Sequence, residues 1–224
     1  YEFQSDTVCI SAGSPEQIVL EDLETCITGI SYDRQEIPEG IYDSLQPQTE
    51  GEEAHPEFFQ ILLAHGGDSR HAPMNRKQIL QSGFDYIALG HIHKPETIVP
   101  DRMIYAGSPE PIDYTDVGPR GYVIGEAVRE PEGWKVRTQW RACCSRQYVD
   151  LEVEVEEDMT NYRLQRMVQE RIDADGGENI YRIRLYGGRS SLFQVDLNGL
   201  TKLYAIYDVM DDTHEAYQLQ RLQE

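Results

Sequence analysis

The sequence predicts a mixed α/β (α+β) fold that ends in a smaller α+β domain. An order of strand, helix and strand within residues 58–93 is typical of a βαβ unit with parallel strands. Residues 148–155 alternate strictly between apolar and mostly acidic side chains, which predicts a half-buried strand. A helical apolar period follows at residues 161–174. We therefore place one domain at residues 1–145 and a second at residues 146–224.

The N-terminal part of the chain is expected to form a meander of strands and then a loop. Short β-rich runs separated by turn residues predict strands at residues 7–11, 17–21 and 26–30. The stretch from Glu36 to Glu57 is rich in carboxylates, Pro, Gly and Gln and contains neither Lys nor Arg. This composition predicts a solvated surface loop.

Two apolar runs in the middle of the chain predict strands that end in histidine. The first run ends at His65, and the second leads through a glycine to His91 and His93. A helix from Asn75 to Ser82, with Asn75 as its N-cap, is expected to connect the two strands. Because such connections usually join parallel neighbours, the three histidines should converge on one edge of the sheet.

The remaining elements follow from alternation and turn residues. Further strands are expected at residues 103–106, 121–125, 134–140, 179–186 and 204–209. The turn residues Pro131, Glu132 and Gly133 predict a hairpin between the second and third of these strands. Either Asp158 or Thr160 is a suitable cap for the helix that begins at about residue 161. Residues 195–203 are expected to form a short helix or a turn.

Charge and composition narrow the class of protein. The formal net charge of -20 argues against binding nucleic acid through a basic surface, although metal ions could supply positive charge at a site. No run of apolar residues is long enough for a membrane span, and the sequence has no signal peptide. The cysteines lack CxxC spacing and are expected to be free thiols in a reducing cytoplasm: Cys9, Cys26, Cys143 and Cys144.

The histidines at the strand ends are the candidate site. Neutral imidazole is a common ligand of Zn, Mn and Fe ions. His91 and His93 stand between Gly90 and Pro95, and His65 ends the preceding strand, so we interpret all three as metal ligands. The histidines in polar sequence are interpreted as surface residues: His55, His71 and His214.

A set of motifs resembles one enzyme family. The motifs are His65-Gly66, Gly90-His91-Ile92-His93, Tyr105-Ala106-Gly107-Ser108-Pro109-Glu110 and Arg120-Gly121-Tyr122. Their order is similar to that in the calcineurin-like metallophosphoesterases. Within that family they most resemble the bacterial SbcD-type and YhaO-type DNA-repair exonucleases, and the alternating region after residue 146 resembles the DNA-facing cap of those proteins.

The resemblance implies a four-layer α-β-β-α sandwich with a small cap domain and two divalent metal ions, expected to be manganese. By matching position, His65 and His91 would bind one ion and His93 the other. The ions would hold a phosphodiester and activate a water for in-line attack. Ser108 lies in a loop that would border the site, where it would have a supporting role.

The sequence departs from the family in its first half. The earlier motifs Asp-x-His, Gly-Asp-x-x-Asp and Gly-Asn-His-Asp/Glu are absent, so the chain is expected to be the C-terminal portion of the catalytic domain plus the cap. An ion held without the missing carboxylates would bind weakly, and we expect little or no nuclease activity from this chain alone. Half a sandwich also leaves apolar surface that a second chain or a second copy should cover.

The resemblance implies DNA and an SbcC-like coiled-coil ATPase as partners. An alternative is a non-catalytic DNA- or ATPase-binding scaffold with a vestigial metal site, and another is a small-molecule phosphodiesterase. In the cap region, Arg182 and Arg184 lie opposite Ile183 and Leu185 on an alternating strand, with Arg189 nearby. These arginines are candidate DNA contacts, and the competing interpretation is a solvated strand face.

Overall fold

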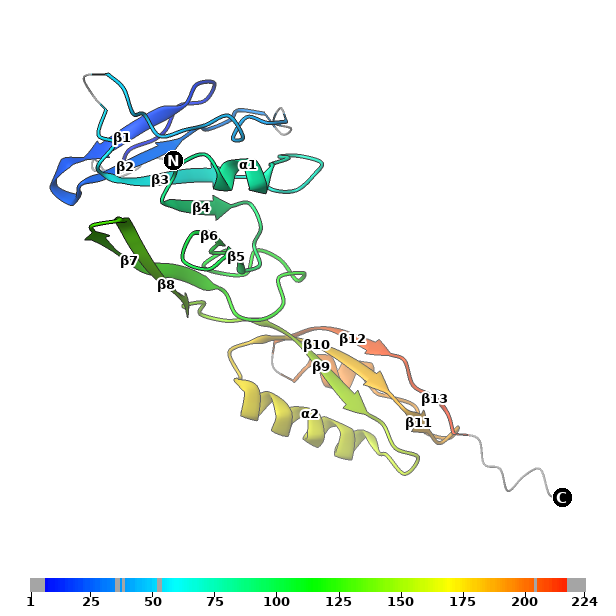
Figure 1. Ribbon diagram of the computed structural model, residues 1–224. Coiled ribbons are helices and arrows are strands. Elements are labelled where there is room, and N and C mark those ends of the chain that lie inside the picture. The colour runs from blue at the N-terminus through cyan, green and yellow to red at the C-terminus, as the bar shows by residue number, and fades with distance from the viewer. Residues whose placement is uncertain (1–6, 35–36, 38, 52–53, 204, 217–224) are drawn as a thin grey trace. The chain divides into compact units, whose positions relative to one another are not determined.

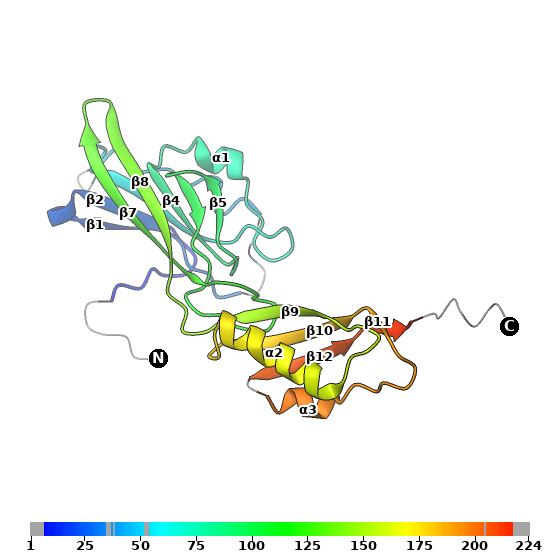
Figure 2. The ribbon, with the colours of Figure 1, turned by 90° about the horizontal axis from the view of Figure 1, so that it is seen from below.

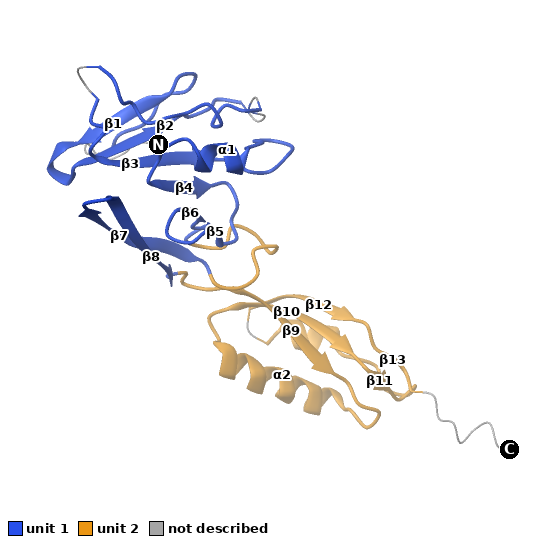
Figure 3. Ribbon diagram, in the orientation of Figure 1, with its two compact units in different colours: residues 1–109, 120–143 blue, residues 110–119, 144–224 orange. Residues whose placement is uncertain are grey.

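The computed structural model describes residues 7–34, 37, 39–51, 54–203 and 205–216, and the chain divides into two compact units. Unit 1 consists of residues 1–109 and 120–143, and unit 2 consists of residues 110–119 and 144–224 (Figure 3). Each unit has its own hydrophobic core. Both combine several strands with few helices, so the prediction of a mixed α/β fold is confirmed.

Unit 1 is built on a six-stranded sheet with the strand order β1-β2-β3-β4-β6-β5 (Figure 1). The central strands β2, β3, β4 and β6 are parallel, and both edge strands are antiparallel to their neighbours. In chain order, β1 to β6 span Glu16–Leu20, Thr25–Gly29, Phe59–His65, Tyr86–Gly90, Glu96–Val99 and Met103–Tyr105. A short 3-10 helix, Glu21–Leu23, joins β1 to β2.

The helix α1 (Arg76–Leu80) connects β3 to β4 and completes the predicted βαβ unit. The side chain of Asn75 accepts a hydrogen bond from the backbone N–H of Gln78 at 3.2 Å, so the predicted N-cap is confirmed. Ile79 of α1 is buried in the core of unit 1. The sheet and its connecting helix therefore place the ends of β3 and β4 next to each other.

Part of the acidic stretch packs against the sheet instead of lying in solvent. Ile37, Tyr42 and Leu45 are buried in the same core as Leu62 and Ile87 of β3 and β4. The expectation of a wholly solvated loop is therefore wrong for these residues. The carboxylates determine the average composition, but a few apolar side chains are enough to anchor the loop on the sheet.

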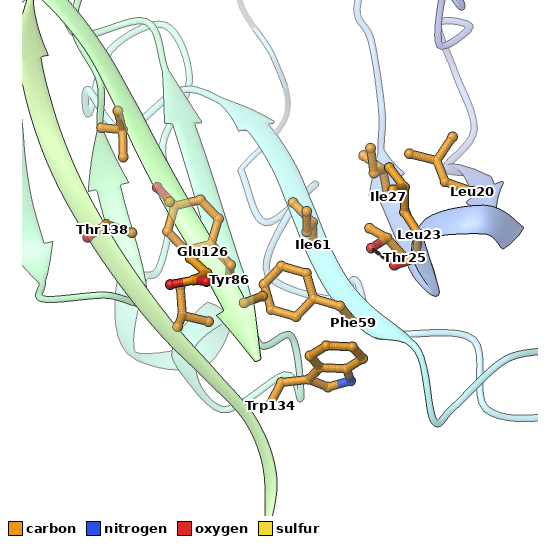
Figure 4. Close-up of a pocket in the computed structure, with 14 residues that line it drawn as sticks. Leu20, Leu23, Thr25, Ile27, Phe59, Ile61, Tyr86, Glu126, Trp134 and Thr138 are labelled. Carbon is orange, nitrogen blue, oxygen red and sulfur yellow. Dashed lines mark hydrogen bonds between the residues drawn. The ribbon is translucent and has the colours of Figure 1, made fainter. Parts of the chain in front are cut away.

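The opposite face of the sheet is partly covered by a hairpin of β7 (Gly121–Glu130) and β8 (Gly133–Ala142). Both strands are longer than predicted, and only Pro131 and Glu132 separate them. A cavity of about 500 Å³ lies between the hairpin and the β1 to β4 part of the sheet (Figure 4). Phe59 and Trp134 meet at this cavity with their ring centroids 5.5 Å apart, so the hairpin is anchored to β3 by aromatic packing.

One strand prediction in unit 1 is wrong, and one strand was not predicted. Residues 7–11 form no strand, and the segment contributes only a nearby isolated bridge between Ala12 and Ser31. The predicted meander is therefore reduced to the antiparallel pair β1 and β2. The edge strand β5 was not expected, because Glu96–Val99 shows no alternation and its strand conformation comes from pairing with β6.

Unit 2 contains a three-stranded parallel sheet, β12-β10-β9, with α2 lying across it (Figure 2). Its elements are β9 Tyr148–Glu154, α2 Asn161–Asp175, β10 Ile180–Tyr186, β11 Gly188–Arg189, α3 Leu197–Thr201, β12 Ile206–Asp211 and β13 His214–Glu215. Thr160 caps α2 by accepting a hydrogen bond from Arg163 N–H at 3.2 Å, which decides between the two predicted caps. Tyr204, at which the last strand was expected to begin, lies outside the described residues.

Two further predictions concern the cysteines and membrane-spanning segments. The four cysteines are free thiols, as predicted. In the part of the chain that the structure describes, no helix combines the length and the apolar character needed to cross a bilayer.

Candidate functional site

The carboxyl ends of β3 and β4 bring two of the predicted histidines together. His65 is the last residue of β3 and pairs with Gly90, the last residue of β4, in the parallel register. His91 directly follows Gly90 in the chain. The imidazole rings of His65 and His91 lie edge to face with their centroids 5.2 Å apart. The sheet register, which the sequence could only suggest, thus determines this proximity.

Gly90 leaves the space that the ring of His65 occupies. A Cβ atom at position 90 would lie 2.9 Å from Nδ1 of His65, closer than side-chain carbons approach nitrogen in proteins. A side chain at this position would displace the imidazole. The glycine before His91 therefore serves the packing of the neighbouring histidine.

His91 has an unusual backbone and a specific partner. Its φ angle is 89°, in the region that residues with side chains rarely adopt. Its Nε2 atom forms a short hydrogen bond with the Asp68 carboxylate. Strained backbone held in place by its surroundings is frequent at functional sites, because the strain fixes where the side chain points.

Asp68 is the acceptor around which the loop after β3 is arranged. Its Oδ1 atom accepts hydrogen bonds from the backbone N–H groups of Arg70 and His71, each at 2.8 Å, and lies 3.1 Å from Nδ1 of His71. The backbone hydrogen bond from His71 is the largest cause that holds the pKa of Asp68 far below its usual value, and the bonds from Arg70, His91 and the His71 ring add to it. Asp68 is therefore an ionised carboxylate beside His91.

Two tyrosines contact the backbone at His65 and Gly66. The buried hydroxyl of Tyr42 lies 3.3 Å from both the backbone nitrogen and the carbonyl oxygen of His65, and Tyr105 donates a hydrogen bond to the Gly66 carbonyl at 2.8 Å. Burial lowers the pKa of His65, and positive charge on His91 and His93 lowers it further. The neutral imidazole, which is the form that binds metal ions, is therefore favoured at His65.

His93 and Ser108 border this cluster. The side chain of His93 is exposed, and its charge acts on His65 as described above. The backbone N–H of Ser108 donates to the His93 carbonyl at 3.0 Å. The Ser108 hydroxyl is buried and has no hydrogen-bond partner among the described residues. The structure thus places Ser108 beside His93 through its backbone, and its supporting role stays a prediction.

The side chains at the strand ends do not fit a complete two-metal centre. Within the described ranges, no group of three or more His, Cys, Asp or Glu side chains is arranged to hold a metal ion. His65 and His91 are close together, but Nε2 of His91 is engaged by Asp68. The arrangement brings two imidazoles and one carboxylate together, and the assignment of His65, His91 and His93 as metal ligands stays a prediction.

The arginines of unit 2 are engaged with protein acceptors. Arg182 binds Asp150 with two hydrogen bonds of 2.8 and 2.6 Å. Arg184 binds Asp212 at 2.7 Å and Glu152 at 3.5 Å. Arg189 donates to the side chain of Thr213 at 2.9 Å and to the Phe193 carbonyl at 2.7 Å. Their role as DNA contacts stays a prediction, and binding to phosphate would have to compete with these acceptors.

Sequence reasoning missed Asp68, His71 and Tyr42 as parts of the histidine cluster. His71 was interpreted as a surface residue, but its ring is part of the hydrogen-bond arrangement around Asp68. The signal that was available is the short spacing of His65, Asp68 and His71 in one loop. Tyr42 had no such signal, because it comes from the acidic stretch and reaches His65 only through the tertiary fold.

Comparison with known proteins finds a limited similarity. No family model matches the chain. Over 74 residues the chain is 31% identical to the uncharacterized metallophosphoesterase YhaO of Bacillus subtilis, and the match covers 30% of this chain and 18% of that protein. The chain thus matches less than a fifth of this relative's length. This similarity supports a distant relationship to the metallophosphoesterases.

Proposed function

We propose that this chain carries the histidine portion of a phosphoesterase site, and that the complete enzyme is a metal-dependent DNA exonuclease of DNA repair. The observation that carries the proposal is the pair His65 and His91 at the ends of adjacent parallel strands. Their ring centroids lie 5.2 Å apart, and the ionised Asp68 lies beside His91. Imidazoles at this edge of an α/β sheet are suited to binding a divalent cation. The limited similarity to YhaO supports the phosphoesterase class.

The proposed site is incomplete in these 224 residues. The family motifs that would supply further carboxylate and histidine ligands are missing from the sequence, and manganese, the expected ion, prefers oxygen ligands. We therefore expect weak metal binding and little or no hydrolysis by the chain alone. Two Mn ions would be held only when other protein supplies the remaining ligands.

The proposed partners follow from the same reasoning. DNA would be the substrate, an SbcC-like coiled-coil ATPase would be the partner in the complete complex, and the location would be cytoplasmic.

A groove of about 710 Å³ lies next to His65 and is mainly apolar. Its lining includes Val8, Ile10, Ile18, Ile30 and Leu63. We expect further protein, from another polypeptide or a second copy, to cover it.

Metal binding and hydrolysis test the proposal together. Equilibrium dialysis with Mn²⁺ should show weak binding that His91→Ala and His65→Ala each reduce. The exposed His214 provides the matched control, since His214→Ala should leave Mn²⁺ binding unchanged. The native chain should cleave neither duplex DNA nor bis-p-nitrophenyl phosphate above the buffer rate.

Three other outcomes of these experiments would lead to different conclusions. Mn²⁺-dependent DNA cleavage that His91→Ala abolishes would contradict the predicted inactivity but support the phosphoesterase site. Cleavage of the small diester alone would favour a small-molecule phosphodiesterase. Mn²⁺ binding that neither His65→Ala nor His91→Ala changes would overturn the site itself.

A second candidate is a scaffold whose metal site no longer works. The observation that favours it is the hydrogen bond between Asp68 and Nε2 of His91, which satisfies a ligand nitrogen without a metal. Salt-sensitive binding to DNA ends without any Mn²⁺ binding would support this candidate over the nuclease.

A further inference from the structure

Among the residues that the structure describes, no helix packs on one face of the parallel sheet in unit 2. α2 contributes Leu164, Val168 and Ile172 to the core on the other face, and Leu200 of α3 joins the same core. Parallel sheets are normally covered by helices on both faces, because their strands lie in the middle layer of an α/β fold. The face opposite α2, which we call the open face, carries the side chains of Asp150, Glu152, Arg182, Arg184, Asp208 and Met210.

Aromatic and apolar side chains gather at one part of the open face. The rings of Tyr148 and Tyr207 meet at right angles with their centroids 5.5 Å apart, and Tyr114 lies 6.2 Å from Tyr207. Tyr114 is 56% exposed and Tyr207 is 38% exposed, and Met210, which pairs with Arg184 further along β12, is 42% exposed. Large side chains grouped in this way offer a contact surface that would gain free energy from being covered.

The charges around this patch are mainly negative. The guanidinium groups of Arg182 and Arg184 are each bound by carboxylates. The carboxylates on and beside the open face, counted with these partners, outnumber the two arginines by five to two: Asp150, Glu152, Glu154, Asp208 and Asp212. A surface with this balance repels a phosphate backbone and attracts a cationic partner.

We propose that the open face binds a basic amphipathic helix of a protein partner. A helix is the element that packs on the free face of a parallel sheet, and its apolar side would lie on Tyr114, Tyr207 and Met210. Lysine and arginine side chains at the edge of that helix would meet Asp208 and the neighbouring carboxylates. The inference concerns unit 2, does not depend on the proposed phosphoesterase site, and is an alternative to the prediction that Arg182 and Arg184 contact DNA.

A designed peptide tests the proposal on the full chain. The probe is a leucine–lysine peptide of roughly four helical turns, and its control has every lysine replaced by glutamate. We expect the lysine peptide to bind with an affinity that falls as salt rises, and the glutamate peptide not to bind. Amide chemical shifts should change along β9, β10 and β12 and not along the solvent side of α2.

Matched variants locate the binding surface. The double variant Tyr207→Ser, Met210→Ser should weaken binding at least about tenfold, because it removes two exposed side chains that the apolar side of the helix would cover. Tyr162→Ser, which removes a tyrosine that is 76% exposed on α2, should change the affinity less than about twofold. Circular dichroism establishes that each variant is folded.

The charge variant Asp208→Lys tests whether the partner of the open face is basic, even if the double variant does not fold. A basic partner should bind this variant more weakly, whereas single-stranded DNA would bind it more strongly. Equal binding of the two peptides, equal effects of the Tyr162 and Tyr207 variants, or DNA binding at the open face would each overturn the proposal.

Discussion

The carboxylate of Asp68 is hydrogen-bonded to Nε2 of His91, although the two residues are 23 positions apart in the chain. The contact links the loop after β3 to the loop after β4. It also engages one of the two ring nitrogens through which His91 could bind a metal ion. Asp68 therefore affects the predicted site in one of two ways, as a competitor of the metal or as a ligand.

The variant Asp68→Asn separates these two roles. Its side-chain oxygen can still accept from the backbone N–H groups of Arg70 and His71, but it loses the negative charge beside His91. If Asp68 competes with the metal, Mn²⁺ affinity measured by equilibrium dialysis should rise by about tenfold, the size expected for one charge-assisted hydrogen bond. Asp22→Asn, at an exposed position, is the control. A lower affinity would instead identify Asp68 as a ligand.

Gly90→Ala should disturb both the fold and the site. The added Cβ would lie 2.9 Å from Nδ1 of His65, so the ring must move. We expect the free energy of unfolding in urea to fall by about 1–3 kcal/mol, as for other overpacked sites, and Mn²⁺ binding to weaken. Gly188→Ala is the control, because its Cβ would meet no atom closer than 3.5 Å. Equal stability of the two variants would contradict the close packing of Gly90.

Ser108→Ala tests whether the buried hydroxyl stabilises the protein. Because this hydroxyl has no hydrogen-bond partner among the described residues, its removal should leave the free energy of unfolding unchanged or raise it by up to about 1 kcal/mol. Ser82→Ala is the matched control, since the Ser82 hydroxyl donates to the Ile79 carbonyl at 2.6 Å. That variant should lose about 0.5–1.5 kcal/mol. A larger loss at Ser108 would show that its hydroxyl has a stabilising partner.

Asp85 should make unit 1 less stable as pH rises. Burial raises the pKa of Asp85 above its usual value, and the backbone N–H of Gln60, which donates to it at 2.8 Å, only partly opposes this. The folded state therefore binds the proton more tightly than the unfolded state, and stability falls as pH rises from the usual value of 3.8 through the raised pKa. Thermal melts of Asp85→Asn should lack this part of the pH dependence, and the profile of Asp22→Asn should match the native one.

Leu63 is the position at which to test the apolar groove beside His65. Its side chain is 48% exposed, so Leu63→Ser should cost little stability. It should, however, reduce self-association in analytical ultracentrifugation and reduce the binding of a hydrophobic dye, because it removes apolar surface from the groove. Leu192→Ser, at a site that is 93% exposed in unit 2, is the control. A native chain that is strictly monomeric would contradict self-association through this groove.

Local sequence signals determined most elements of the fold. The apolar run that ends at His65, the Asn75 cap and the alternation of β9 each act within a few residues, and the structure has them where they were expected. The strand β5 and the buried Tyr42 were not predictable in this way. Both owe their structure to partners far along the chain, β6 for the strand and the sheet core for the tyrosine.

In the candidate site, too, some features follow from the local sequence and others only from the tertiary structure. The sequence by itself determined which residues are candidates for the site, because His65, His91 and His93 lie at or just after the ends of strands whose apolar pattern is local. Only the tertiary structure decided that His65 and His91 meet, that Gly90 makes room for the ring, and that Asp68 engages His91. The reason is physical: strand formation depends on neighbouring residues, whereas the contacts of a side chain depend on sheet register and loop conformation, which distant residues set.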